Sequence, residues 1–246
     1  MDTITKLGTV FASFVICQLI FHFVSSWFST KVFPRFNSLS WEEKIDWNSR
    51  VVSTYHASVV GVFCLYILFF DKALRADPIR GDPWLVNVNI AITSGYLISD
   101  LLFLIFYWKA IGETVYIVHH CAMLYICFHI LKEGILAYIG NFRLIAEIST
   151  PFVNQRWFLR TLRYQKSSEA YIINGVLMTV TFFLTRTAMI PAFYYYLYCM
   201  YGTDVYIGLG LLIQCSLIGS CVTIDVMNAI WMVKISRGWV KLIQEI

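Results

Sequence analysis

The sequence has little charge: only 14% of its 246 residues are Asp, Glu, Lys or Arg, whereas 59% are hydrophobic. About a quarter of the residues in a soluble domain are charged, so this composition excludes an ordinary soluble globular protein. Apolar runs repeatedly approach the ~20 residues that cross a bilayer core as a helix. The chain is therefore predicted to be an all-α polytopic membrane protein.

Other signals are also absent. The seven cysteines lie inside apolar runs without CxxC spacing, which argues against a zinc or redox motif and indicates free, buried thiols. The net charge of +4 is scattered, so nucleic acid is not an expected partner. The first apolar run lacks a small-residue cleavage site, and we expect a retained anchor rather than a removed signal peptide.

Seven apolar segments can be separated along the chain. A polar connector, 29–47, follows the first segment, and in it Ser40 and Glu43 have the spacing of a helix capping box. This predicts a short helix that Trp41 and Trp47 would hold at the membrane interface. A charged loop, 71–83, separates the second and third segments. The seven predicted spans are 7–28, 51–70, 85–108, 115–131, 135–158, 171–198 and 205–233.

The loops differ in positive charge from one side of the membrane to the other. Most of the Lys and Arg side chains fall in the alternate loops that share a side with the C-terminal tail. Positively charged loops remain in the cytosol. We therefore expect a lumenal N-terminus and a cytosolic C-terminus.

Polar and ionisable groups inside the spans are the strongest functional signal, because a charged group at the centre of a membrane helix costs ~2.5–3.5 kcal/mol on insertion scales. The adjacent histidines His119 and His120 stand in the fourth span. Arg143 and Glu147 lie four residues apart, on one face of the fifth. The other side chains expected to line a cavity or to stabilise the bundle are His56, Asp100, Asn154, Arg186 and Asp225.

The histidine pair indicates chemistry. Neighbouring helical positions point about 100° apart, so one of His119 and His120 is expected to face a cavity and the other a neighbouring helix. A neutral imidazole can act as a nucleophile or a proton shuttle. We expect Glu147 to orient it, as the carboxylate does in a catalytic triad. Pro151 is expected to free the Glu147 carbonyl and to create a polar wall.

A purely structural interpretation stands beside this one. Arg143 and Glu147 would neutralise each other, and the histidines would only link helices by hydrogen bonds. Neither His119 nor His120 has the partner at i+4 that an HExxH zinc site requires, so no metal site is assigned.

Four stretches, in order, resemble the TLC domain family, which includes the ceramide synthases and the translocating-chain-associated membrane protein. They are WNSRVVSTYHA, GYLISDLLF, HHCAMLY and GNFRLIAEISTPFVNQRW. The resemblance implies a six-helix TLC barrel after one N-terminal span, and a role in lipid homeostasis in the endoplasmic reticulum membrane. It divides the chain into an N-terminal transmembrane anchor and connector (1–39), a TLC domain (40–237) and a short cytosolic tail (238–246).

The ceramide synthases use an adjacent histidine pair and acidic residues about one span later. The resemblance therefore implies that His119, His120 and Glu147 are catalytic if this protein is an enzyme, with acyl-CoA as the substrate and no resident cofactor. The second acidic position is Thr150 here. This departure from the family pattern argues against acylation of a sphingoid base.

Two classes of function follow. In the first, the protein holds a membrane lipid or fatty-acyl chain within the barrel and influences membrane lipid composition. In the second, it is a histidine-dependent acyltransferase of the ceramide-synthase type. A seven-span receptor is disfavoured, because Asp-Arg-Tyr is absent from the end of the third span and the tail is short. The sequence leaves open which lipid is bound and whether the chain forms a homo-oligomer.

Overall fold

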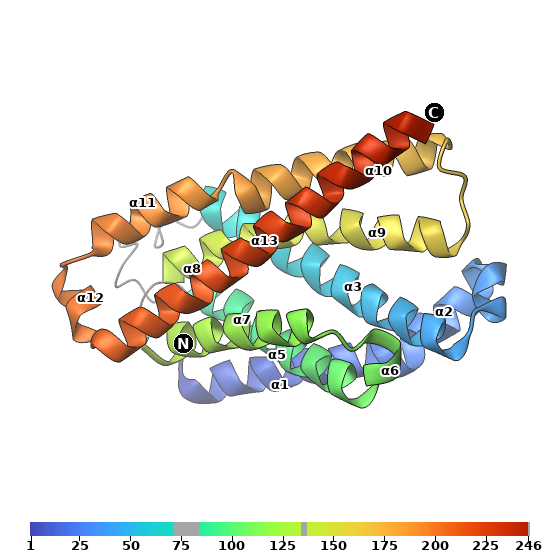
Figure 1. Cartoon of the computed structure of the whole chain (residues 1–246). Coiled ribbons are helices and arrows are strands. Elements are labelled where there is room, and N and C mark those ends of the chain that lie inside the picture. The colour runs from blue at the N-terminus through green and yellow to red at the C-terminus, as the bar shows by residue number, and fades with distance from the viewer. Residues whose placement is uncertain (71–83, 134–136, 246) are drawn as a thin grey trace.

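The computed structural model describes residues 1–70, 84–133 and 137–245, and within these ranges the chain is helical without strands (Figure 1). The predicted loop 71–83 and the first two residues of the fifth predicted span, 135 and 136, lie outside the described residues. The α-helices are α1 (Thr3–Leu19), α2 (Ser25–Val32), α3 (Trp41–Phe70), α5 (Trp84–Phe106), α6 (Trp108–Ile111), α7 (Thr114–Glu133), α8 (Ala137–Leu144), α9 (Thr150–Thr161), α10 (Glu169–Phe182), α11 (Ile190–Met200), α12 (Asp204–Gly208) and α13 (Leu211–Glu245). Two π-helical turns, η1 (Ile20–Val24) and η4 (Phe183–Thr187), and two 3₁₀ turns, η2 (Pro34–Ser38) and η3 (Ile145–Ser149), join some of them.

The prediction of an all-α polytopic membrane protein is confirmed. Among the described residues, six helical stretches are long and apolar enough to cross a membrane: Thr3–Val32, Trp41–Phe70, Trp84–Phe106, Thr114–Lys132, Glu169–Met200 and Leu211–Lys241. The remaining predicted span, 135–158, is divided among α8, η3 and α9. The helix α13 continues into the predicted tail, 238–246, as far as Glu245.

The break in the fifth segment coincides with Pro151, which lies in the first turn of α9. Proline is tolerated there, because the first backbone N–H groups of a helix have no partner within that helix. The expectation that Pro151 frees the Glu147 carbonyl is wrong: this carbonyl accepts a hydrogen bond from the backbone N–H of Thr150. The 3₁₀ turn therefore supplies a hydrogen-bond partner for the Glu147 carbonyl where the helix changes direction.

The capping box is confirmed at the start of α3. The backbone N–H of Ser40 donates to the Glu43 carboxylate at 2.9 Å, and the backbone N–H of Glu43 donates to the Ser40 hydroxyl at 3.2 Å. The helix that it caps is not short, however, because α3 continues without a break to Phe70. Trp47 is buried rather than interfacial, and its indole N–H donates to Ser29 at 2.9 Å.

The N-terminal helix α1 packs along α5, and the two lie side by side in Figure 1. Small and polar residues mediate this contact: Ser13 donates to the Ile92 carbonyl at 2.7 Å, and Gln18 donates to Ser99 at 3.0 Å. At Gly95 the backbones come so close that an added Cβ would press on the Val10 carbonyl and lie 2.7 Å from the Ser13 Cβ. Small residues permit such close approach between membrane helices.

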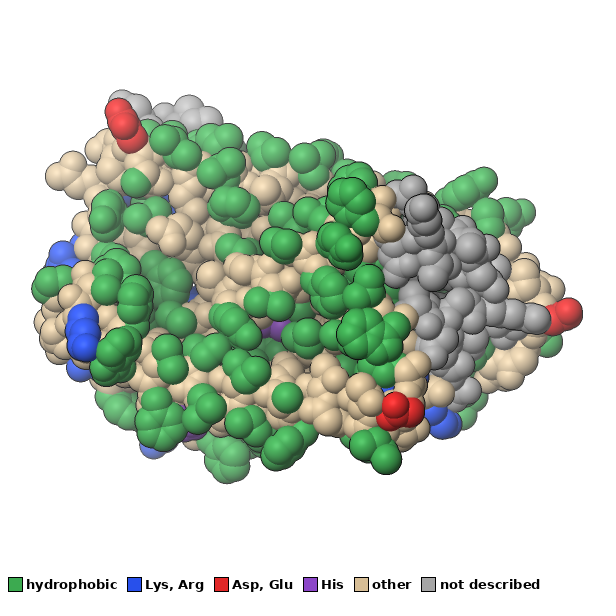
Figure 2. All heavy atoms as spheres, turned by 180° about the vertical axis from the view of Figure 1, so that it is seen from behind, with side chains coloured by type: hydrophobic (Ala, Val, Ile, Leu, Met, Phe, Trp, Pro, Cys, Tyr) green, Lys and Arg blue, Asp and Glu red, His purple; other side chains and the backbone are tan. Residues whose placement is uncertain are grey.

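The outer surface is apolar, as a surface facing lipid should be. Figure 2 shows hydrophobic side chains over most of one face, with charged side chains mainly toward its two ends. Large apolar side chains that are more than half exposed occur on several spanning helices, for example Phe11, Val62, Phe106, Ile173 and Leu212. Because the polar groups inside the spans face inward instead, the fold concentrates them between helices.

We predict that Gly95→Ala destabilises the α1–α5 contact by about 1–3 kcal/mol, the usual cost of overpacking. The matched control is Gly219→Ala on α13, where an added Cβ meets nothing within 4 Å. That change should be neutral or stabilising by up to about 1 kcal/mol, because alanine is the better helix former. Unfolding in mixed detergent micelles measures both variants. A Gly95→Ala protein as stable as wild type would contradict the close approach.

Candidate functional site

A cavity of about 460 Å³ lies within the bundle. Side chains from α3, α5, α7, α9, α10 and α13 line it, together with the segment between α5 and α7 and the turn η3. The candidate residues that the structure brings to this cavity are His56, Asp100, His119, His120, Glu147, Asn154 and Arg186. Two candidates, Arg143 and Asp225, lie outside its lining.

His120 is buried on α7 and both of its ring nitrogens are engaged. Nδ1 lies 2.7 Å from the Tyr116 carbonyl oxygen, which can only accept, so Nδ1 carries a proton. Nε2 lies 3.0 Å from Oδ2 of Asp100 on α5. One further proton is therefore shared between this nitrogen and the Asp100 carboxylate.

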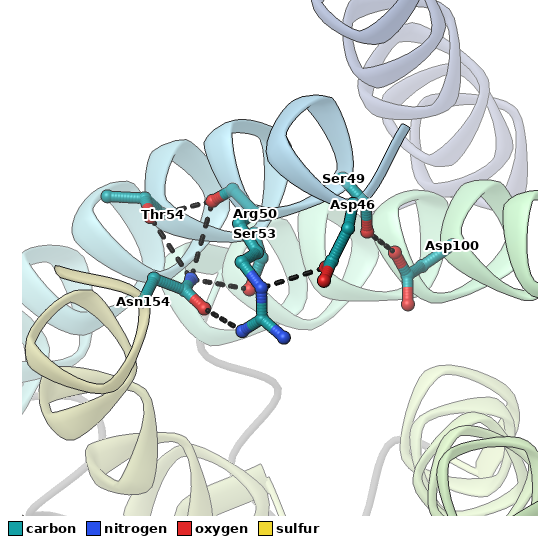
Figure 3. Close-up of polar contacts among 7 residues, drawn as sticks. All are labelled: Asp46, Ser49, Arg50, Ser53, Thr54, Asp100 and Asn154. Carbon is teal, nitrogen blue, oxygen red and sulfur yellow. Dashed lines mark hydrogen bonds and ion pairs between the residues drawn. The ribbon is translucent and has the colours of Figure 1, made fainter. Parts of the chain in front are cut away.

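The carboxylate that contacts His120 is not the one that the sequence predicts. Glu147 was expected to orient the imidazole, but Asp100 does so by direct contact. Ser49 on α3 donates to the other Asp100 oxygen at 3.4 Å, which links a third helix to the pair (Figure 3). Residues 20 positions apart in the sequence form this pair because α5 and α7 pack against each other.

His119 occupies a different environment from its neighbour. Its ring packs edge-on against His120 and Trp231, with centroid distances of 5.5 and 5.4 Å. Its Nδ1 is buried without a hydrogen-bond partner among the described residues. Of the two histidines, His119 therefore has the nitrogen that the protein leaves unoccupied.

His56 is a third imidazole on the cavity wall. It is 2% exposed, and its ring stacks on Tyr96 at a centroid distance of 3.9 Å. Tyr96 in turn lies 6.2 Å from the His120 ring. Neither His56 nitrogen has a hydrogen-bond partner within the described part of the chain. A buried imidazole without partners is costly, so these nitrogens are candidates for contact with water or a ligand.

Glu147 belongs to a separate polar group in the cavity lining, formed by η3, α9 and η4. It accepts a hydrogen bond from Thr150 at 3.1 Å, and the same hydroxyl accepts one from Arg186 at 2.9 Å. Arg186 also donates to Ser149 at 2.8 Å and to Asn228 at 3.2 Å. Thr150 therefore stands between a carboxylate and a guanidinium, at the position where the family resemblance implied a second acid.

The predicted neutralisation of Arg143 by Glu147 is wrong. Arg143 forms an ion pair with Asp225 on α13 at 2.7 Å and donates to the Cys221 carbonyl at 3.2 Å. Its guanidinium also lies over the Phe193 ring, 4.0 Å from the centroid. These contacts join α8, α11 and α13 beside the cavity rather than within it.

One end of the cavity carries a polar cluster of Asp46, Arg50 and Asn154, of which the sequence predicted only Asn154 (Figure 3). Arg50 donates through Nε to Asp46 at 2.8 Å and through Nη1 to Asn154 at 3.3 Å. The spacing of Asp46 and Arg50, four residues apart, was a visible signal for an ion pair on a helix. Both residues precede the apolar part of α3 and so lie outside the predicted span 51–70.

Comparison with known proteins gives a family. The TLC domain matches residues 46–237. The chain is 58% identical to human TLC domain-containing protein 4, across 100% of this chain and 94% of the relative. It is 53% identical to Xenopus laevis TLC domain-containing protein 4-B, across 94% and 88%, and 27% identical to Saccharomyces cerevisiae Topoisomerase I damage affected protein 4, across 74% and 66%. No solved structure matches the chain significantly.

A double-mutant cycle tests which carboxylate interacts with His120. Combining His120→Gln with Asp100→Asn should give a coupling free energy of about 1–3 kcal/mol, because the imidazole and the carboxylate form a charge-assisted hydrogen bond with each other. Combining His120→Gln with Glu147→Gln should give less than about 0.5 kcal/mol. Detergent unfolding measures both. Larger coupling to Glu147 than to Asp100 would contradict the geometry.

A second pair of variants tests the Arg143–Asp225 ion pair. Asp225→Ala should cost about 3–5 kcal/mol of unfolding free energy, because it leaves a largely buried guanidinium unpaired. Removing the charge as well, in Asp225→Ala/Arg143→Met, should recover much of that loss. The pairing is refuted if the double variant is no more stable than Asp225→Ala alone.

Proposed function

This chain belongs to the TLC domain family, and from that premise we propose that it binds an acyl lipid inside its helical bundle and so influences membrane lipid composition. The observation that carries the proposal is the cavity of about 460 Å³ among membrane-spanning helices. Ligand pockets usually enclose about 300–1,000 Å³ and combine an apolar lining with a few placed polar groups. This cavity has both kinds of lining.

The two kinds of lining suit an amphiphile. Polar groups include His56, His119, and the Asp100–His120 pair. Apolar side chains that could contact a hydrocarbon chain are Leu97, Leu104, Met123, Val153, Met178 and Phe182. A fatty-acyl lipid presents a polar end and an apolar chain, and it is abundant in the membrane that surrounds the helices.

We also propose the membrane and the orientation. The endoplasmic reticulum is the proposed location, with a lumenal N-terminus and a cytosolic C-terminus, because Lys and Arg are enriched in the loops on the C-terminal side. The cavity reaches the exposed residues Lys109, Glu113 and Lys234 at the end that this orientation places in the cytosol. Cytosolic acyl compounds would then have access to it.

A second candidate function is histidine-dependent acyl transfer from acyl-CoA. His119 has a buried nitrogen without a partner, whereas both nitrogens of His120 are engaged. His119 would attack the thioester carbonyl and release the CoA thiolate, and the Asp100–His120 pair would supply the proton that the thiolate takes up. Glu147, expected to be catalytic, would be held by Thr150, which also accepts from Arg186.

We predict that an acyl lipid copurifies with the wild-type chain in a neutral detergent and that Met178→Trp, which fills the cavity, removes most of it. Met178 lines the cavity on α10. The matched control is Val176→Trp on the same helix, at a position that is 46% exposed. Native mass spectrometry measures the bound lipid, after gel filtration has shown that each variant is folded.

The same preparation separates the two functions. Under denaturing conditions, an acyl mass that stays attached to wild type but is lost in His119→Ala supports acyl transfer. Lipid that dissociates completely supports binding without a covalent step. A folded Met178→Trp protein that retains as much lipid as wild type would count against the cavity as the binding site.

A further inference from the structure

We propose that Arg50 forms a headgroup site at the end of the cavity and binds the carboxylate or phosphate of a single-chain acyl lipid. This inference rests on the proposed function, because the lipid chain would occupy the cavity behind the headgroup. We define the cavity mouth as Asp46, Arg50, Lys109, Glu113 and Lys234, which line its more exposed end. Arg50 lies in WNSRVVSTYHA, one of the stretches that resemble the family, but the resemblance assigns no role to any of these five residues.

The Arg50 guanidinium is held on three sides. Asp46 accepts from Nε at 2.8 Å, and Asn154 on α9 accepts from Nη1 at 3.3 Å. The indole of Trp157 lies beneath the group, with its ring centroid 4.7 Å from Cζ. No described residue accepts a hydrogen bond from Nη2. Nη2 of a planar, fixed donor group is therefore available to a ligand.

Asn154 fixes the orientation of this arrangement. It is 4% exposed, and its amide nitrogen donates to the Arg50 carbonyl, the Ser53 hydroxyl and the Thr54 hydroxyl at 3.3, 3.2 and 3.0 Å (Figure 3). Its Oδ1 is thereby turned toward the guanidinium. A donor group that is already immobilised loses little conformational entropy when a ligand binds.

The charges at the mouth favour an anion. Lys109 and Lys234 are exposed there beside the half-buried Arg50, and among the mouth residues only Asp46 and Glu113 oppose them. Asp46 accepts from Nε and Asn154 accepts from Nη1, so Nη2 is the guanidinium nitrogen that has no acceptor among the described residues. Guanidinium groups match the two oxygens of a carboxylate or phosphate, and such charge-assisted hydrogen bonds are about twice as strong as neutral ones.

The rest of the cavity indicates what the anion is attached to. Deeper in the cavity, acidic and basic groups are already matched: Asp100 with His120, and Glu147 with Arg186 through Thr150. Apolar side chains such as Leu97, Val153 and Phe182 line the cavity beside the polar His56, Thr93 and Tyr96, and about 460 Å³ in all is available. A lipid with an oxyanion bound to Arg50 and one hydrocarbon chain against the apolar side chains fits this lining.

The test compares three ligands that share an oleoyl chain: oleate, lysophosphatidic acid and neutral monooleoylglycerol. Inorganic phosphate is the fourth probe and represents a free anion. Dissociation constants are measured for the purified full chain in a neutral detergent. The variants are Arg50→Gln and Arg50→Lys, and the control is Arg160→Gln, an exposed position on α9 outside the cavity lining. Gel filtration and thermal unfolding establish that each variant is folded.

We expect wild type to bind the two anionic lipids about tenfold or more tightly than monooleoylglycerol, the range that one charged hydrogen-bonded contact supplies. Arg50→Gln should remove this preference without changing the affinity for monooleoylglycerol. Arg50→Lys should retain part of it, because the charge remains but the planar fork is lost. Arg160→Gln should bind as wild type does.

Other results would overturn the inference. A wild-type protein without the preference, or a folded Arg50→Gln protein that keeps it, would exclude Arg50 as the headgroup site. Competition by inorganic phosphate as strong as that by lysophosphatidic acid would assign the site to a free anion. Monooleoylglycerol reports separately on the proposed function: if it binds but the preference is absent, only the headgroup site fails.

Discussion

The contact between His120 and Asp100 shows the constraint on which the rest of this structure depends. Inside an apolar bundle, a polar side chain has no bulk water to bind and must find its partner on another helix. His120 meets this requirement through Asp100, Arg143 through Asp225, and Arg186 through Ser149, Thr150 and Asn228. The bundle is therefore held together laterally by its own polar groups, which are directed away from the apolar outer surface.

The sequence could predict local features but not the contacts between helices. Local features came out correctly, as with the capping box of Ser40 and Glu43, because its two partners are three residues apart and depend only on helix geometry. The long apolar helices followed from composition and length. The gathering of His119, His120 and Glu147 around one cavity followed from the cost of burying polar groups and from the family resemblance.

The pairings failed where three-dimensional packing decides. Arg143 and Glu147 share a face only if the helix between them is regular, but η3 begins at Ile145 and turns more tightly than an α-helix. The two side chains do not pair: Glu147 accepts from Thr150, and Arg143 reaches Asp225, 82 residues later. Asp100 could not be matched with His120 from sequence spacing either, since the match depends on how α5 and α7 are aligned.

Thr150 gives a physical meaning to the departure from the family pattern. A second carboxylate there would lie beside Arg186 and compete with Glu147 for the same guanidinium, whereas the hydroxyl accepts from Arg186 and donates to Glu147. The charges of Glu147 and Arg186 then offset each other through Thr150, without excess negative charge. Asp100 is paired separately, with His120. At the cavity mouth, by contrast, Nη2 of Arg50 has no acceptor among the described residues, which is the basis for placing an anionic headgroup there.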